Sequence, residues 1–166
     1  SVEYFSMCNR LVSRNVFERN VILPFEGVNM WDDVGLCTRV RFYTRGTAVI
    51  NKGFYHYNRQ NEQSTTRRPL LERAREQELC VSCIEDFFRK EDSHDKYRLF
   101  LSYLRLVAAE DLFYYEPDIW RQKFEGLKDD LWKLRKLYTT KQLFKFYTLG
   151  CGGIIGKLVW KRFWKR

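Results

Sequence analysis

Apolar residues recur every three or four positions through most of the sequence that follows Pro69. This spacing predicts an amphipathic helix over 70–90 and a second helix over 93–112. Pro69 suits the first turn of the first helix, and Ser93 suits the N-cap of the second. Pro117 opens a shorter predicted helix.

The sequence after this third helix is more broken. A polar turn is expected over 126–130. Apolar stretches at 143–147 and 154–164 follow, and glycines at 150, 152 and 153 interrupt them.

Residues 1–66 have a different pattern. The pair Asp32 and Asp33 precedes apolar residues at helical spacing and predicts a helix. Residues 47–57 alternate β-branched and aromatic residues with other types, which predicts one or two strands. Together these signals predict an α+β fold that is mostly α-helical, with a short α/β piece at 1–66 followed by a helical region at 67–166.

The α/β piece is short for an independent fold. Its expected strands have no obvious partner strand, and isolated strand pairs are only marginally stable in water. The sequence also begins at Ser1 without an initiator Met. We therefore expect a fragment whose upstream part supplies the rest of a sheet. We also expect the unpaired strand edge to drive self-association.

Basic residues are concentrated at the C-terminal end. Residues 131–166 contain seven Lys, three Arg and no acid, whereas residues 1–130 contain the other 20 basic residues and all 21 acids. The net charge of +9 therefore belongs to the end of the chain. A neutral body with a basic, Trp-rich end favours an anionic membrane surface over nucleic acid as the partner.

The last predicted helix carries the side chains for such a contact. Trp160, Phe163 and Trp164 are expected on one side, and Lys161 and Arg162 mostly on the other. No apolar run reaches the ~20 residues of a spanning helix, and no signal peptide is visible. The expected location is cytoplasmic and peripheral, at the inner face of the cell membrane. The alternative is a core helix with a polar outer face.

The five cysteines do not indicate a secreted disulfide framework, because their number is odd and their spacing irregular. Cys80 and Cys83 form a C-x-x-C, but no second pair or His motif completes a zinc site. Their position within a predicted helix favours packing in the core.

Three segments resemble family 2 glycosyltransferases, in the order and with the spacing of that family. Cys-Asn-Arg-Leu-Val-Ser-Arg at 8–14 resembles its Trp-Asn-Lys-Leu-φ-Arg-Arg segment. Glu-Gly-Val-Asn-Met-Trp-Asp-Asp at 26–33 resembles the turn that leads into its Glu-Asp pair. Residues 53–64 resemble its Pro-Leu-Tyr-x-Tyr-Arg-x-x-x-x-Ser loop. The remainder is similar to the variable C-terminal region of bacterial members that build surface polysaccharides.

The resemblance implies an inverting transfer of a sugar from a nucleotide sugar to a cell-surface polysaccharide or glycolipid acceptor. It makes Asp33 the general base that takes the acceptor proton, and Asp32 the residue that orients acceptor hydroxyls. Arg59, Ser64 and His56 would bind the donor. On local pattern alone, the two aspartates are more typical of a helix N-terminus than of a catalytic pair, whereas Arg59 is equally typical of a solvated loop.

The sequence departs from the family in three places. The nucleotide-binding half, with its Asp-x-Asp metal motif, is absent. Asp32 stands where the family has Glu, and Gly53 stands where it has Pro. We therefore expect Mg²⁺ or Mn²⁺ in the whole enzyme, no metal bound by this chain, and no activity of this chain alone.

The alternative function is a non-catalytic helical module. It would bind a membrane, a nucleic acid or a protein partner through the basic aromatic C-terminus. An Asp-x-Asp segment encoded upstream of Ser1 favours the transferase, whereas a gene that starts near Ser1 favours the module.

Overall fold

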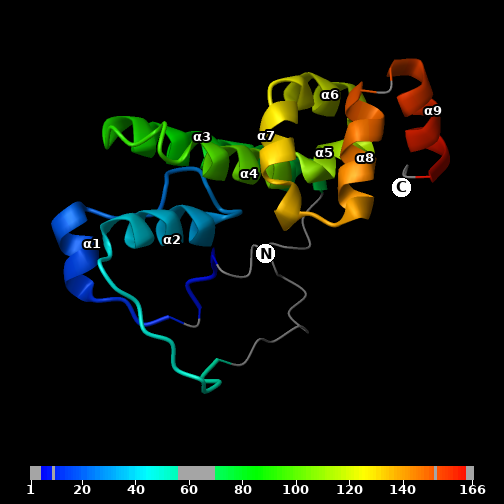
Figure 1. Cartoon of the computed structure of the whole chain (residues 1–166). Coiled ribbons are helices and arrows are strands. Elements are labelled where there is room, and N and C mark those ends of the chain that lie inside the picture. The colour runs from blue at the N-terminus through cyan, green and yellow to red at the C-terminus, as the bar shows by residue number, and fades with distance from the viewer. Residues whose placement is uncertain (1–4, 9, 56–69, 152, 164–166) are drawn as a thin grey trace.

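The computed structural model describes residues 5–8, 10–55, 70–151 and 153–163. Within these ranges the chain is mostly helical and contains no strand (Figure 1). The helices are α1 (Arg14–Asn20), α2 (Asp32–Tyr43), α3 (Leu70–Lys90), α4 (Arg98–Ala108), α5 (Glu110–Tyr115), α6 (Pro117–Glu125), α7 (Lys128–Lys133), the short 3-10 helix Arg135–Leu137, α8 (Thr140–Cys151) and α9 (Gly153–Phe163).

Helices α2, α3 and α4 enclose the first of two hydrophobic cores, which we call the N-terminal core. Aromatic rings close its end where the chain turns from α3 to α4. The Phe88 and Tyr97 rings stack there with their centroids 4.3 Å apart. The buried members of this core are Phe5, Val28, Val34, Cys37, Cys80, Val81, Ile84, Phe88, Leu101, Leu104 and Ala108.

The second core, the C-terminal core, lies among α4, α5, α6, α7 and α8. The Trp120 ring stacks on both Phe124 and Phe146, at centroid distances of 4.8 Å and 5.5 Å. Its buried members are Ala74, Leu106, Ala109, Leu112, Phe113, Trp120, Phe124, Leu127, Leu131, Leu134 and Phe146. Helix α9 lies outside this core, next to α8 (Figure 1).

Three of the predicted helix starts are confirmed. Helix α2 begins at Asp32, α3 begins directly after Pro69, and α6 begins at Pro117. The predominantly helical character expected for the chain is therefore present.

Three details of the helical region differ from the expectation. The single helix expected over 93–112 is two helices, which separate at Ala109, and the first begins at Arg98 with Tyr97 rather than Ser93 at its N-cap. The polar turn expected over 126–130 contains the start of α7, because Leu127, Leu131 and Leu134 are spaced along one buried face. Helix α8 continues past Gly150 rather than ending before it.

The strands expected over 47–57 do not form in residues 47–55, where the structure describes the chain. Val49, Ile50 and Phe54 are exposed there, and no neighbouring segment pairs with them. A strand without a ladder partner gains no inter-strand hydrogen bonds to offset the loss of conformational entropy. Neither the α+β part of the expected fold nor the strand edge expected to drive self-association is seen in the described residues.

Candidate functional site

The Asp32–Asp33 pair forms the first turn of α2. The Asp32 side chain is exposed and the Asp33 side chain is partly buried. Both carboxylates lie at the positive end of the helix dipole, where negative charge stabilises a helix. The structure therefore supports the predicted helix start and presents one of the two acids openly to solvent.

Helix α3 holds the turn that leads into this pair. The Met30 backbone N–H donates to the Glu76 Oε2 at 2.7 Å, and the Cys80 thiol donates to the Trp31 carbonyl at 3.2 Å. Trp31 has the left-handed backbone conformation, with φ of 70°. A bulky residue rarely adopts this conformation unless surrounding contacts fix it. The two contacts from α3 thus position the turn.

The N-terminal segment supplies the direct partners of Asp33. The Ser6 hydroxyl and the Met7 backbone N–H donate hydrogen bonds to its carboxylate, and the charge of Arg10 acts on it from the same segment. Burial, followed by the charge of Asp32, raises the pKa of Asp33 above its ordinary value, although these donors and Arg10 oppose the shift. A carboxylate with a raised pKa is a better proton acceptor than an exposed aspartate.

The geometry around Asp33 serves two purposes at once. Its hydrogen bonds attach residues 6 and 7 to the start of α2, which is a structural role. A carboxylate has about four lone-pair positions, so two donors leave acceptor capacity for a substrate hydroxyl. The site can therefore both fix the N-terminal segment and accept a proton.

The three predicted donor-binding residues are not described by the structure. His56, Arg59 and Ser64 lie outside the described residues. The third resembling segment is described only as far as Tyr55, and both Phe54 and Tyr55 are exposed.

The predicted membrane residues gather on or after α9. Lys161, Arg162 and Phe163 are exposed at its C-terminal end. Trp160 lies within α9, but its side chain is outside the description, and Trp164 lies beyond the described residues. Among the described helices, none is both long enough and apolar enough to cross a bilayer.

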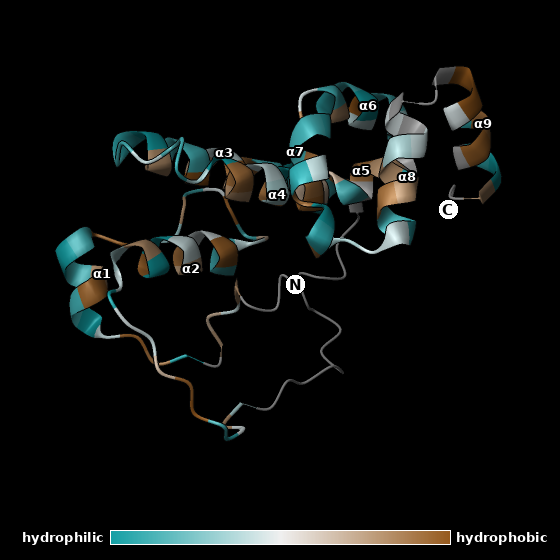
Figure 2. Cartoon of the chain, viewed as in Figure 1, coloured by the Kyte–Doolittle hydropathy of each residue, from teal (hydrophilic) through white to brown (hydrophobic). Residues whose placement is uncertain are grey.

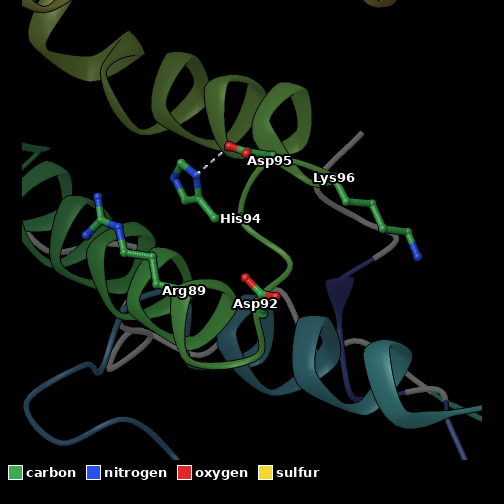
Figure 3. A pocket seen from close by; sticks show the side chains of 5 residues that line it. All are labelled: Arg89, Asp92, His94, Asp95 and Lys96. Atoms are coloured by element: carbon green, nitrogen blue, oxygen red, sulfur yellow. Dashed lines mark ion pairs between the residues drawn. The ribbon is translucent and has the colours of Figure 1, made fainter.

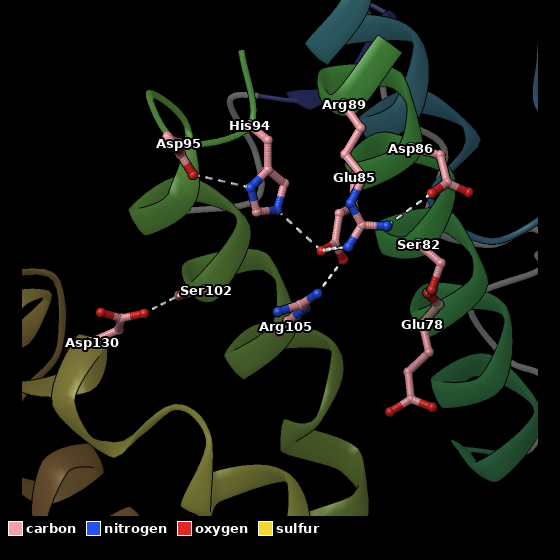
Figure 4. Close-up of polar contacts among 10 residues, drawn as sticks. All are labelled: Glu78, Ser82, Glu85, Asp86, Arg89, His94, Asp95, Ser102, Arg105 and Asp130. Atoms are coloured by element: carbon pink, nitrogen blue, oxygen red, sulfur yellow. Dashed lines mark hydrogen bonds and ion pairs between the residues drawn. The ribbon is translucent and has the colours of Figure 1, made fainter. Parts of the chain in front are cut away.

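A second polar cluster, which the sequence analysis missed, joins α3 to α4 (Figure 4). The Glu85 side chain is only 10% exposed and accepts from Arg105 of α4. Glu85 Oε1 also lies 2.7 Å from the Arg89 guanidinium and 3.2 Å from the His94 Nε2. Burial alone would raise the pKa of Glu85, but Arg105, then His94 and Arg89, lower it below its ordinary value.

An open pocket of about 270 Å³ lies beside this cluster (Figure 3). It is lined by Arg89, Asp92, His94, Asp95 and Lys96, so cationic and anionic groups alternate around it. The His94 Nδ1 lies 3.5 Å from Asp95, which engages the ring from its second side. The Glu85–Arg89 spacing of four residues was the one sequence signal for this cluster. Because the charges of its walls largely compensate one another, the pocket does not favour an anionic or a cationic ligand.

Neither a search for metal ligands nor comparison with known proteins identifies a further functional residue. Within the described ranges, no group of three or more His, Cys, Asp or Glu side chains could hold a metal ion. Cys80 of the C-x-x-C is fully buried in the N-terminal core, and burial raises its pKa to about 12. Comparison with protein-family models, curated proteins and solved structures gave no match.

Proposed function

We propose that this chain is the acceptor-side part of a bacterial glycosyltransferase related to family 2. The enzyme would move a sugar from a nucleotide sugar to a polysaccharide or glycolipid acceptor at the inner face of the cell membrane, with inversion at the anomeric carbon. The donor-binding half, with Mg²⁺ or Mn²⁺ on its Asp-x-Asp motif, would precede this chain. In this proposal the short N-terminal region is the remnant of a larger α/β transferase domain.

One observation supports this proposal more than any other. Two of the segments that resemble the family meet around the Asp33 carboxylate, which belongs to segment 26–33. Arg10 of segment 8–14 acts on this carboxylate through its charge. Ser6 and Met7, which directly precede segment 8–14, donate hydrogen bonds to it. Nothing in their separation along the chain requires this proximity. A role of Asp33 as the reactive carboxylate would explain why both segments resemble the family, since each contributes residues to the same site.

The proposed chemistry follows from the placement of the two aspartates. Asp33 takes the proton from the attacking hydroxyl as the new glycosidic bond forms, and its raised pKa suits this role. Asp32, exposed on the adjacent position, accepts hydrogen bonds from other acceptor hydroxyls. The expected donor contacts from His56, Arg59 and Ser64 remain part of the proposal.

Substitution of Asp33 in a protein that carries the donor-binding half tests the proposal. Asp33→Asn should reduce turnover at least ~100-fold, because the amide cannot take the proton, while donor affinity stays nearly unchanged. The rate of the parent enzyme should also fall as the pH falls through the raised pKa of Asp33, since only the ionised form is a base.

Asp32→Asn is the matched control, because it removes a neighbouring carboxylate without removing the base. It should raise the acceptor KM more than it lowers kcat. A near-normal rate for Asp33→Asn, with unchanged unfolding, would move the base to Asp32 or to another part of the enzyme. The 166-residue chain alone should turn over no nucleotide sugar.

A further inference from the structure

Helix α9 carries a row of aliphatic side chains that no other part of the described structure covers. Ile154, Ile155 and Leu158 are 80%, 74% and 62% exposed. We call these three residues, together with Lys161 and Arg162, the α9 face. Figure 2 shows hydrophobic residues along α9 at the edge of the molecule. Aliphatic side chains rarely gather on an exposed helix unless they contact another apolar phase.

The opposite side of α9 is fixed to the protein, which determines where the α9 face points. Gly156 is buried, so the helix approaches the body of the molecule on that side. At the border of the α9 face, the Lys157 Nζ makes an ion pair of 2.5 Å with the Asp118 Oδ1 of α6, which also attaches the helix to the protein. The residues of the α9 face lie at other positions of the helical turn, and their side chains reach solvent.

Two cations continue the same row. Lys161 and Arg162 follow Leu158 by three and four residues, so they lie one turn further along the same side of the helix. Both side chains are exposed. Residues 131–166 contain no acidic residue to neutralise them within this part of the sequence. The α9 face therefore combines an aliphatic half with a cationic end.

We infer that the α9 face binds an anionic lipid bilayer, with α9 lying in the interfacial plane. The aliphatic half would enter the boundary between headgroups and acyl chains, and the longer Lys161 and Arg162 side chains would reach lipid phosphates. At 11 residues, α9 is too short to span the hydrocarbon layer, which is consistent with an interfacial position.

The composition of the face favours lipid over the other occupants. Sequence-independent binding to single-stranded nucleic acid relies on aromatic stacking, and the three apolar members of the face are aliphatic. A second copy packed in parallel would bring its own cationic end against Lys161 and Arg162, and one packed antiparallel would place these cations against the aliphatic half of its α9 face, without an anion to pair with. An anionic bilayer offers both an apolar layer and negative charge.

This inference adds aliphatic residues to the contact expected of the C-terminal helix, where Phe163 is 71% exposed as well. The sequence analysis placed the apolar contacts at Trp160, Phe163 and Trp164, with the basic residues mostly opposite. In the structure, Ile154, Ile155 and Leu158 lead the exposed row, and the basic residues continue it. The inference deepens the membrane location in the proposed function, but it needs no sugar transfer, so either can fail without the other.

Flotation of the 166-residue chain with lipid vesicles tests the inference. The chain should bind vesicles of phosphatidylcholine with phosphatidylserine at low salt, bind pure phosphatidylcholine at least about tenfold more weakly, and be partly released by high salt. Ile155→Ser with Leu158→Ser should reduce binding about tenfold or more, because it removes much of the inserted apolar surface.

Matched controls distinguish binding by the α9 face from non-specific binding by other exposed residues. Leu23→Ser removes a leucine that is 64% exposed, close to the 62% of Leu158, but lies far from α9 in the sequence, and it should leave binding unchanged. Lys161→Glu with Arg162→Glu should weaken binding to anionic vesicles much more than the same charge change at Arg45 and Lys52. Circular dichroism and thermal unfolding should show that every variant is folded.

Three results would overturn the inference. The first is failure of the folded parent chain to bind anionic vesicles at low salt. The second is vesicle binding that the Ser substitutions in α9 leave unchanged, since that indicates attraction of polyanions by charge alone. The third is a parent chain that self-associates through α9 and becomes monomeric in the Ser variant without any vesicle binding.

Discussion

The Cys80 thiol donates a 3.2 Å hydrogen bond to the Trp31 carbonyl, so the middle of α3 supports the residue that directly precedes the Asp32–Asp33 pair. The two residues are 49 positions apart in the sequence. Glu76, one turn earlier on α3, supports the neighbouring Met30 in the same way. The C-x-x-C that the sequence presents as a metal or redox signal thus contributes one of its thiols to the position of the candidate catalytic turn.

The first prediction concerns thiol reactivity. Burial raises the pKa of Cys37 to about 11 and that of Cys80 to about 12, whereas Cys8 is exposed. Since only the thiolate reacts, Cys8 should be alkylated at pH 8 at least ~100-fold faster than Cys37 or Cys80. Peptide mapping by mass spectrometry after timed alkylation measures each rate. In denaturant the three rates should become similar. Equal rates in the native protein would mean that α2 and α3 separate readily.

The second prediction concerns Glu85, the carboxylate between α3 and α4. Its folded pKa is lowered, so its contribution to stability is present above its ordinary pKa and is lost as the pH falls through the folded value. Glu85→Gln should lower the free energy of unfolding by about 1–3 kcal/mol at neutral pH, because it removes the charged partner of Arg105 and Arg89. The effect is limited because these two arginine side chains are about half exposed and water partly screens the pairs. Urea unfolding should show this difference shrinking in acid.

Asp86→Asn is the control for Glu85. Asp86 also pairs with Arg89, at 3.2 Å, but its side chain is 64% exposed. An exposed pair of this kind contributes about 0–1 kcal/mol. Equal effects of the two substitutions would show that the buried cluster adds nothing beyond surface charge.

The third prediction concerns the contact of α8 with α6. A Cβ added at Gly150 would lie 2.2 Å from two carbons of the Phe124 ring, and that ring is only 1% exposed. The ring cannot move aside freely, so Gly150→Ala should destabilise the protein by about 1–3 kcal/mol despite the higher helix propensity of alanine. Gly46→Ala, where a Cβ meets nothing within 4 Å, should change the stability by less than about 0.5 kcal/mol.

Local signals in the sequence were sufficient to predict part of this fold. Pro69, Pro117 and the Asp32–Asp33 pair act within one or two turns, and each marks a helix start that the structure contains. These signals depend on backbone geometry and on acidic charge in the first helical turn, which nearby residues determine.

The rest depends on contacts between distant segments. Asp130 reads as part of a polar turn, yet it is buried in α7, because Ser102 and Arg98 of α4 donate to its carboxylate. The partners of Asp33 come from residues 6 and 7, about 26 positions away, and no periodicity predicts such a contact. Residues 47–55 have the residue types of a strand but no partner strand among the described residues, and pairing rather than composition decides whether a strand forms.

Helix α3 contributes side chains to both hydrophobic cores, and this has a consequence for cleavage of the polypeptide. Cys80, Val81, Ile84 and Phe88 face the N-terminal core, whereas Ala74 belongs to the C-terminal core. A protease cut between α2 and α3 would leave two pieces that remain associated through these residues. A polypeptide that starts at residue 67 would instead expose that apolar surface to water and tend to aggregate.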